Sequence, residues 1–365
     1  MAKSYTPGLK ILNNTEIERE RKLPLKGDIN CNKGDFVNND TIVASTKLPG
    51  NIHMINIASQ LNIDASSLKD YLIVKINQHV KKDEVIAENK GLFGFFKTQV
   101  KSPIEGKISN ISTTTGQIMI SEPDIPIEID AYIDGEIKEI INNEGVVVRS
   151  EGCLVQGIIG VGGEKKGELL FLDDQVSEDF EGKIVVIRGS INKKKYDSLS
   201  RKGALGVVAG GFDYKSLSDI LGYRLGVAIT GTENISTTLV ITEGFGDVEM
   251  SSKTFELLKK YNKSKVSING ATQIRAGVIR PEVIIPSPNK KDFIKSFDEN
   301  DLVIKEGSNV RVIREPYFGK IGIVMKLPSE PVMIESETKA RIAEVEFDNN
   351  ERKLVPRANL EIILD

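Results

Sequence analysis

The chain has 365 residues, a length that suggests two or three domains. Hydrophobic residues make up 39% and charged residues 28%, a composition typical of a folded globular protein and unlike that of a disordered chain. The 49 Lys and Arg residues against 52 Asp and Glu residues give a net charge of -3, which excludes a globally basic nucleic-acid coat protein. Two His and two Cys residues are too few for a zinc module or a disulfide scaffold.

The chain begins with a polar, charged segment that lacks the apolar core of a signal peptide. No apolar run approaches the ~18 residues that a membrane-spanning helix needs. Cys31 and Cys153 lie far apart in strand-like contexts, which is typical of reduced core residues. We therefore expect a cytoplasmic protein without a membrane contact, in which residues 1–22 form an N-terminal extension.

From residue 23 to 150 the chain alternates apolar and polar residues between Gly and Asn turns, a pattern that predicts short strands. Two stretches repeat each other, since Val37, Asp40, Ile42 and Ala44 align with Val80, Asp83, Val85 and Ala87. A second pair has the same Gly-to-Gly spacing, with Gly106, Ile108, Ile111 and Gly116 matching Gly135, Ile137, Ile140 and Gly145. These half-motifs predict a small sheet structure built from two similar halves. A short helix is expected between the first two stretches, after Asp64 or Ser66.

From residue 151 to 288 strand-like apolar runs alternate with short amphipathic helices, which predicts an α/β domain with some parallel pairing. In outline this domain resembles swivelling β/β/α modules. Residues 289–304 are polar and are expected to form a linker. Residues 305–365 are expected to form a compact β unit.

The last unit carries a spacing of Gly, Val and Tyr residues that has a physical reason. A strand ends, the chain turns tightly at a glycine, and the next strand begins after a second glycine. The residues that carry this pattern are Gly307, Val310, Val312, Tyr317, Gly319, Gly322 and Val324. The unit resembles a KOW-type SH3-like barrel of NusG-type transcription factors and some ribosomal proteins. It departs from that motif at Pro316, where a glycine is common.

Residues 71–120 resemble the barrel-sandwich hybrid fold of biotinyl and lipoyl carrier domains. The residues that carry the resemblance are Val80, Asp83, Val85, Ala87, Ser102, Pro103, Gly106 and Gly116. The hairpin that follows Ala87 lacks the carrier signatures, which argues against modification of Lys90 or Lys97. Three aromatic residues surround its glycine, namely Phe93, Phe95 and Phe96. They predict a docking patch if exposed and core if folded under, and core is favoured.

In the α/β domain, polar residues follow apolar strands at Asp213, Thr230, Thr232, Glu243 and Asp247. Ligands bind at the carboxyl ends of parallel strands, so these residues are the candidate ligand pocket. Ordinary turn and capping chemistry is the favoured alternative. Two arginines, Arg275 and Arg280, suit either a phosphate or carboxylate ligand or a contact that braces two domains.

No catalytic residue is nominated, because His53 and His79 lack a partner at a useful spacing. Whether the chain is an enzyme is therefore open, with the balance against it, and no cofactor or metal is expected. Candidate contacts for nucleic acid or a protein partner are Arg311, Arg314, Tyr317, Lys320, Lys193, Lys194 and Lys195. Residues 306–365 hold nine Lys and Arg against eleven Asp and Glu, which argues against a strong grip on RNA by this unit alone.

The sequence thus predicts a multidomain, mainly β protein with an α/β middle domain. Its parts are a barrel-sandwich-like domain at 23–150, a swivelling-type domain at 151–288 and a small KOW-like barrel at 305–365. The leading hypothesis is a non-enzymatic adaptor that docks on a nucleoprotein machine such as RNA polymerase or the ribosome. One alternative is a protein-only scaffold or assembly factor, and another is a ligand-binding or enzymatic α/β domain. The oligomeric state is not indicated.

Overall fold

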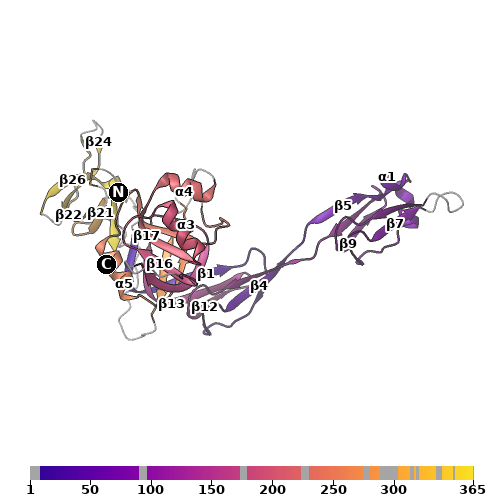
Figure 1. The fold of residues 1–365 in the computed structure, drawn as a ribbon, viewed down its shortest axis with the longest axis horizontal. Helices are drawn as coiled ribbons and strands as arrows, with labels where there is room; N and C mark the ends of the chain where they lie inside the picture. The colour runs from indigo at the N-terminus through magenta and orange to yellow at the C-terminus, as the bar shows by residue number, and fades with distance from the viewer. Residues whose placement is uncertain are drawn as a thin grey trace.

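The computed structural model describes residues 9–89, 97–172, 179–222, 230–273, 279–287, 303–312, 316–317, 320–333, 339–347 and 350–364. It confirms a mainly β architecture with several sheets. Figure 1 shows a body from which a distal lobe stands off on a narrow stalk. The stalk contains two antiparallel strands, β4 (Ile42–Leu48) and β11 (Ile125–Asp130).

Four neighbouring strands at the centre of the body are parallel: β15 (Glu164–Phe171), β16 (Lys183–Ile187), β17 (Gly206–Phe212) and β18 (Thr238–Phe245). β17 is buried along its whole length because helices cover both faces of the sheet. One face carries α3 (Lys193–Arg201) and α4 (Tyr214–Leu221), and the other carries α5 (Ser252–Lys260). No helix in the described ranges is long and apolar enough to cross a membrane.

Antiparallel strands extend this sheet on both sides. β14 (Ile159–Val161) pairs with β18. On the other side follow β19 (Lys265–Asn269), β20 (Glu282–Pro286), β13 (Gly145–Gln156) and β1 (Leu9–Lys22). β1 pairs with β13 from Ile11↔Val155 to Lys22↔Gly145. The expected N-terminal extension is therefore a long strand of the body from residue 9 onward. Its residues alternate between buried and exposed positions, but the many polar residues hide this strand pattern in the sequence.

The C-terminal unit continues the same sheet rather than forming a separate one. Its strands are β21 (Asn309–Val312), β22 (Ile321–Lys326), β25 (Ile342–Phe347), β26 (Arg352–Pro356) and β27 (Leu360–Leu364), with a 3-10 turn at Arg357–Asn359. A small hairpin joins β23 (Val332–Met333) to β24 (Lys339–Ala340). β27 pairs with β21 and also, in parallel, with β1. The unit has its own core, which includes Val310, Val324 and Val345.

The sequence repeat belongs to two modules, one nested inside the other. The proximal module lies at the base of the stalk and uses β2 (Asp28–Ile29), β3 (Phe36–Val37), β4, β11, β12 (Gly135–Ile141) and β13. The distal lobe is inserted between β4 and β11. Its strands are β5 (Ile52–Asn56), β6 (His79–Val80), β7 (Val85–Asn89), β8 (Thr98–Lys101), β9 (Gly106–Ser112) and β10 (Gln117–Ser121). Its helices are α1 (Ile57–Leu61) and α2 (Leu68–Tyr71), with a 3-10 turn at Ala65–Ser67.

The two modules match in strand pairing and in backbone hydrogen bonds. Val37 pairs with Gly135 in one and Val80 with Gly106 in the other. The N–H of Gly34 donates to Ile137 O and that of Asn77 to Ile108 O, both at 2.8 Å. The expected single domain at 23–150 is therefore two modules, because each repeated half pairs with its own partner and not with the other copy.

Ion pairs between side chains fix the base of the stalk to the body. Arg21 of β1 contacts Asp130 of β11 at 3.3 Å and Glu164 of β15 at 2.6 Å. Lys166 Nζ contacts Asp130 at 2.5 Å and Asp40 at 2.6 Å. Because these groups come from four separate segments, they hold the stalk in one direction relative to the sheet.

Candidate functional site

The carboxyl edge of the parallel strands holds two of the predicted pocket residues. Asp213 follows β17 and Asp247 follows β18, and the N–H of Gly246 donates to Phe212 O at 3.0 Å between them. Asp213 caps α4 by accepting from Ser216 N at 2.8 Å and Ser216 Oγ at 2.9 Å. These hydrogen bonds lower the pKa of Asp213. Asp247 accepts from the hydroxyl of Ser190 at 2.5 Å.

The protein's own backbone covers this edge. A Cβ at Gly210 would lie 2.4 Å from Met250 N, and one at Gly211 would lie 2.4 Å from Gly246 O. The paired glycines at the end of β17 therefore let the segment after β18 cross the strand at contact distance. This close backbone contact accounts for the two glycines.

The side chains of the other predicted pocket residues have different partners from those of Asp213 and Asp247. Thr230 is buried, donates to Gly160 O at 2.8 Å and accepts from Thr272 N at 2.8 Å. Thr232 is exposed. Glu243 is buried at the boundary with the C-terminal unit, where Ser251 N donates to it at 3.0 Å. The expected cluster is thus divided among four surroundings, and all of its members except the exposed Thr232 form hydrogen bonds within the fold.

Arg311, predicted as a nucleic-acid or partner contact, instead holds two parts of the body together. Its side chain is about 5% exposed and pairs with Glu243 of β18 and, at 2.8 Å, with Glu361 of β27. Arg280 joins the same group at 3.2 Å from Glu361. A buried guanidinium between two carboxylates has no surface to offer a ligand, so the arginine in this strand braces the junction. Arg275 and Arg314 lie outside the described residues.

The remaining candidates in the C-terminal unit lie at one corner, where Lys320 is exposed, Tyr317 is half-buried and the Phe347 ring is buried. The rings of Tyr317 and Phe347 lie 5.6 Å apart, and Lys320 Nζ lies 5.6 Å and 5.3 Å from their respective centroids. Tyr317 also packs on the core of the unit. Lys320 is exposed and lies 3.9 Å from Glu351. This corner presents one cation above two aromatic rings, an arrangement that suits a small contact with a polar partner.

The three candidate lysines of the middle domain all lie on α3. On α3, Lys193 pairs with Asp197 at 2.5 Å, while Lys194 and Lys195 are exposed. The lysines of α5 lie on the opposite face of the sheet. The hairpin residues Lys90, Phe93, Phe95 and Phe96 lie outside the described residues. Lys97 Nζ contacts Glu88 at 2.5 Å.

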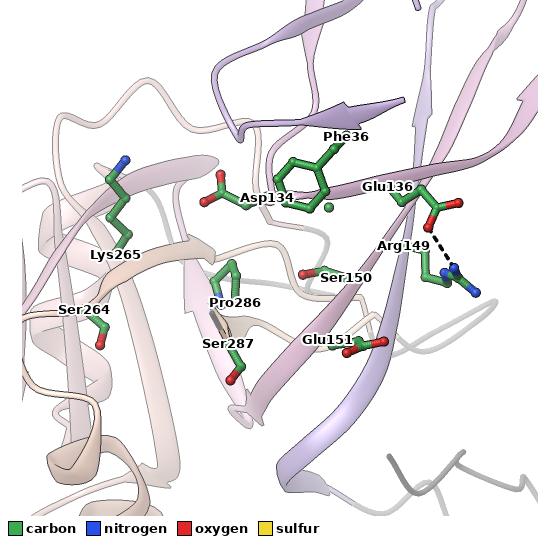
Figure 2. Close-up of a pocket in the computed structure, with 11 residues that line it drawn as sticks. Phe36, Asp134, Glu136, Arg149, Ser150, Glu151, Ser264, Lys265, Pro286 and Ser287 are labelled. Carbon is green, nitrogen blue, oxygen red and sulfur yellow. Dashed lines mark hydrogen bonds and ion pairs between the residues drawn. The ribbon is translucent and has the colours of Figure 1, made fainter. Parts of the chain in front are cut away.

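A hollow of about 450 Å³ lies where the proximal module meets β19 and β20 (Figure 2). Phe36 overhangs it and is 66% exposed, and Lys265 extends along its other side. Arg149 in its wall pairs with Glu136 at 2.9 Å. Its remaining lining is Asp134, Gly135, Ser150, Glu151, Ser264, Pro286 and Ser287. None of the residues nominated from the sequence lines it. The sequence did offer one signal for this hollow: Phe36 is an aromatic residue at a position where the alternating pattern of the strand calls for a polar one.

The hollow offers hydrogen-bonding and ionic groups but no paired catalytic groups. Arg149 is less available to a ligand because it already pairs with Glu136. The hydrogen bond from Arg149 to Glu136 also raises the pKa of the Arg149 guanidinium. The described ranges contain no group of three His, Cys, Asp or Glu side chains placed to hold a metal. Burial raises the pKa of the Cys153 thiol to about 12, so this buried cysteine is protonated and is no nucleophile at neutral pH.

Comparisons with known proteins leave the geometry as the guide to function. No protein-family model matches this chain, and no curated protein sequence matches it.

Proposed function

We propose that this protein is a non-enzymatic adaptor that docks on a nucleoprotein machine of transcription or translation. The observation that carries the proposal is the distal lobe, which stands off the body on a braced two-stranded stalk (Figure 1). Such an arm separates two binding surfaces by a fixed distance. This is the geometry that an adaptor between two partners needs.

The state of the charged groups supports the same reading. The junction between the sheet and the C-terminal unit is held by ion pairs that involve Arg311, Glu243 and Arg280. The aspartates at the carboxyl edge cap a helix or bind a serine. The polar clusters nominated from the sequence therefore support the fold, and the KOW-like resemblance supplies the class of machine.

The corner at Tyr317 and Lys320 is the contact surface that we propose on the KOW-like unit. One exposed lysine over two rings is a small basic feature on a unit of acidic balance. We infer a contact with a protein component of the machine, because RNA binding depends on several phosphate contacts.

The test is recovery of partners on the tagged full-length chain from its native cell, with and without nuclease. We expect ribosomal or polymerase subunits in a nuclease-resistant eluate. Lys320→Glu is expected to reduce their recovery about fivefold or more, the effect of losing ~1 kcal/mol of binding. Lys326→Glu is the matched control, because Lys326 is an exposed lysine of the same unit without an aromatic contact among the described residues. An eluate without such subunits overturns the proposal.

A protein-only scaffold is the second candidate, and the burial of Arg311 favours it over an RNA adaptor. In that case the same experiment yields one unrelated protein complex. Recovery that disappears on nuclease treatment instead assigns the contact to nucleic acid and contradicts this candidate.

A further inference from the structure

β5 is an open edge of the distal lobe's sheet. The strand order of that sheet is β5–β10–β9–β6, and β5 pairs only with β10 among the described strands. Its outer face carries two large apolar side chains, with Ile52 61% and Met54 66% exposed. An exposed apolar edge strand is a site where another chain can add a strand.

The backbone N–H and C=O groups of β5 point alternately toward β10 and away from it, and one hydrogen bond shows which residues point which way. Glu122 N donates to Asn51 O at 2.9 Å, so position 51 faces β10. In an antiparallel ladder the direction of these groups alternates with each residue. The N–H and C=O groups of Ile52 and Met54 and the N–H of Asn56 therefore point away from β10, along the open edge. The C=O of Asn56 is used inside the chain, because Asn56 is the N-cap of α1 and its carbonyl accepts the first hydrogen bond of that helix.

The proximal module provides an internal comparison for this strand. Ile120 pairs with Ile108 and with His53 in the distal lobe, and Val148 pairs with Ile137 and with Arg19 in the proximal module. Since Ile108 and Ile137 occupy matching places, β1 occupies the place of β5.

The outer positions of these two strands differ in chemistry. Glu18 stands where the distal lobe has Ile52, and Glu20 stands where it has Met54. Glu18 pairs with Lys138, and Glu20 pairs with Lys22 at 2.7 Å. The same fold is thus stable with charged residues at these positions, so the apolar pair in the distal lobe is not required by the module's own folding.

Other described edge strands of comparable length carry features that discourage pairing. β11 contains Pro126 and Glu128, and β26 contains Arg352 and Lys353 and ends at Pro356. β5 has no Lys, Arg, Asp, Glu or proline along its length, and its one titratable residue, His53, contacts Glu122 at 3.0 Å on the side of the strand opposite Ile52 and Met54. Of these three edge strands, β5 is the one without a feature that discourages pairing with another strand.

We propose that two copies of the chain associate through β5, antiparallel and centred on Met54. In this register Met54 faces its own copy, and Ile52 of each chain faces Asn56 of the other. The outward groups of these three positions then form four backbone hydrogen bonds, two within the pair of Met54 residues and one from each Asn56 N–H to Ile52 O of the other chain. The edge carries no charge that would oppose its own copy, and the apolar side chains of the two outer faces join into one stripe.

The size of this contact sets its strength. A strand of five residues buries less than the ~1,600 Å² of a standard interface, so the dimer is reversible. We expect the full chain to associate at concentrations of roughly tens to hundreds of micromolar. Because β5 lies in the lobe at the end of the stalk, the dimer is extended, with the two bodies at opposite ends (Figure 1).

The experiment combines sedimentation equilibrium with small-angle X-ray scattering across this concentration range. We expect a dimer whose maximum dimension approaches twice that of the monomer. A chain that stays monomeric overturns the proposal and leaves the edge to a strand from a different protein. A dimer whose maximum dimension does not grow also overturns it, since that dimer uses another surface.

The variant Ile52→Glu/Met54→Glu copies the residues of the proximal module. It is expected to remain folded by circular dichroism and to weaken association at least tenfold, because like charges then face each other across the pair. Met333→Glu is the matched control, since Met333 is similarly exposed on a hairpin of the C-terminal unit, and it is expected to dimerise normally. Equal association by both variants contradicts the proposal. This result is independent of partner recovery by the adaptor.

Discussion

The guanidinium of Arg311 lies between Glu243 and Glu361, and all three side chains are about 95% buried. Arg311→Met leaves both carboxylates without this partner in a medium that solvates them poorly. We expect the free energy of unfolding of the body to fall by about 3–5 kcal/mol, measured by urea denaturation. Arg352→Met removes an exposed pair with Glu346 and is expected to cost less than ~1 kcal/mol. Equal losses in the two variants contradict the structural role of Arg311.

At the scale of residues, the sequence indicates side-chain chemistry better than side-chain partners. Asp213 follows an apolar run, and both its place at a strand end and its capping alternative could be written down in advance. The pairing of Arg311 with Glu243 could not, because the two residues belong to units whose docking no local pattern encodes. The hollow beside Phe36 was missed for the same reason, since its walls come from strands distant in sequence.

At the scale of elements, the stalk depends on Lys166. Burial alone would lower the pKa of this lysine, but hydrogen bonds to Asp130 and Asp40 outweigh it and raise the pKa above its ordinary 10.5. A raised pKa in the folded state contributes stability that is complete below about pH 10.5 and is lost as the pH rises through the folded value. The natural chain is therefore expected to lose stability through this group as the pH rises from about 10.5 through the raised pKa of the folded state.

Arginine keeps its charge across that range, so Lys166→Arg is expected to show a smaller loss of the free energy of unfolding. The measurement is urea denaturation at both ends of the pH range. Lys326→Arg, at an exposed lysine, is expected to leave the pH dependence unchanged. If Lys166→Arg and Lys326→Arg follow the same curve, the ion pairs at the base of the stalk do not contribute.

The repeat at this scale was readable, while its topology was not. Aligned Val, Asp and Gly positions predict that two stretches share a local structure, and Val37 and Val80 do occupy matching strands. Alignment does not say which copy pairs with which. Pairing of each half with its own partner is a long-range property, and the nested arrangement of lobe and stalk follows from it.

At the scale of the whole molecule, the distal lobe and the body have separate cores. The distal core is built on Ile108, Ile118 and Ile120, and it shares no member with the clusters around β16 and β17. Only the stalk strands connect the two parts. A substitution that destabilises one core therefore has no contact with the other core through which to destabilise it. We therefore expect two transitions in calorimetry, one for each part.

Matched cavities test this independence. Ile118→Ala in the distal lobe and Ile184→Ala in the body each remove a fully buried isoleucine, at an expected cost of about 2–5 kcal/mol to the transition concerned. Each variant is expected to lower the midpoint of its own transition, by about 8 °C or more for the small lobe and about 4 °C or more for the larger body, and to leave the other in place. A single transition that moves in both variants would mean that stalk and lobe unfold with the body. Independent transitions instead describe a lobe that keeps β5 folded whatever the state of the body, which is what the proposed adaptor role and the proposed association through β5 both need.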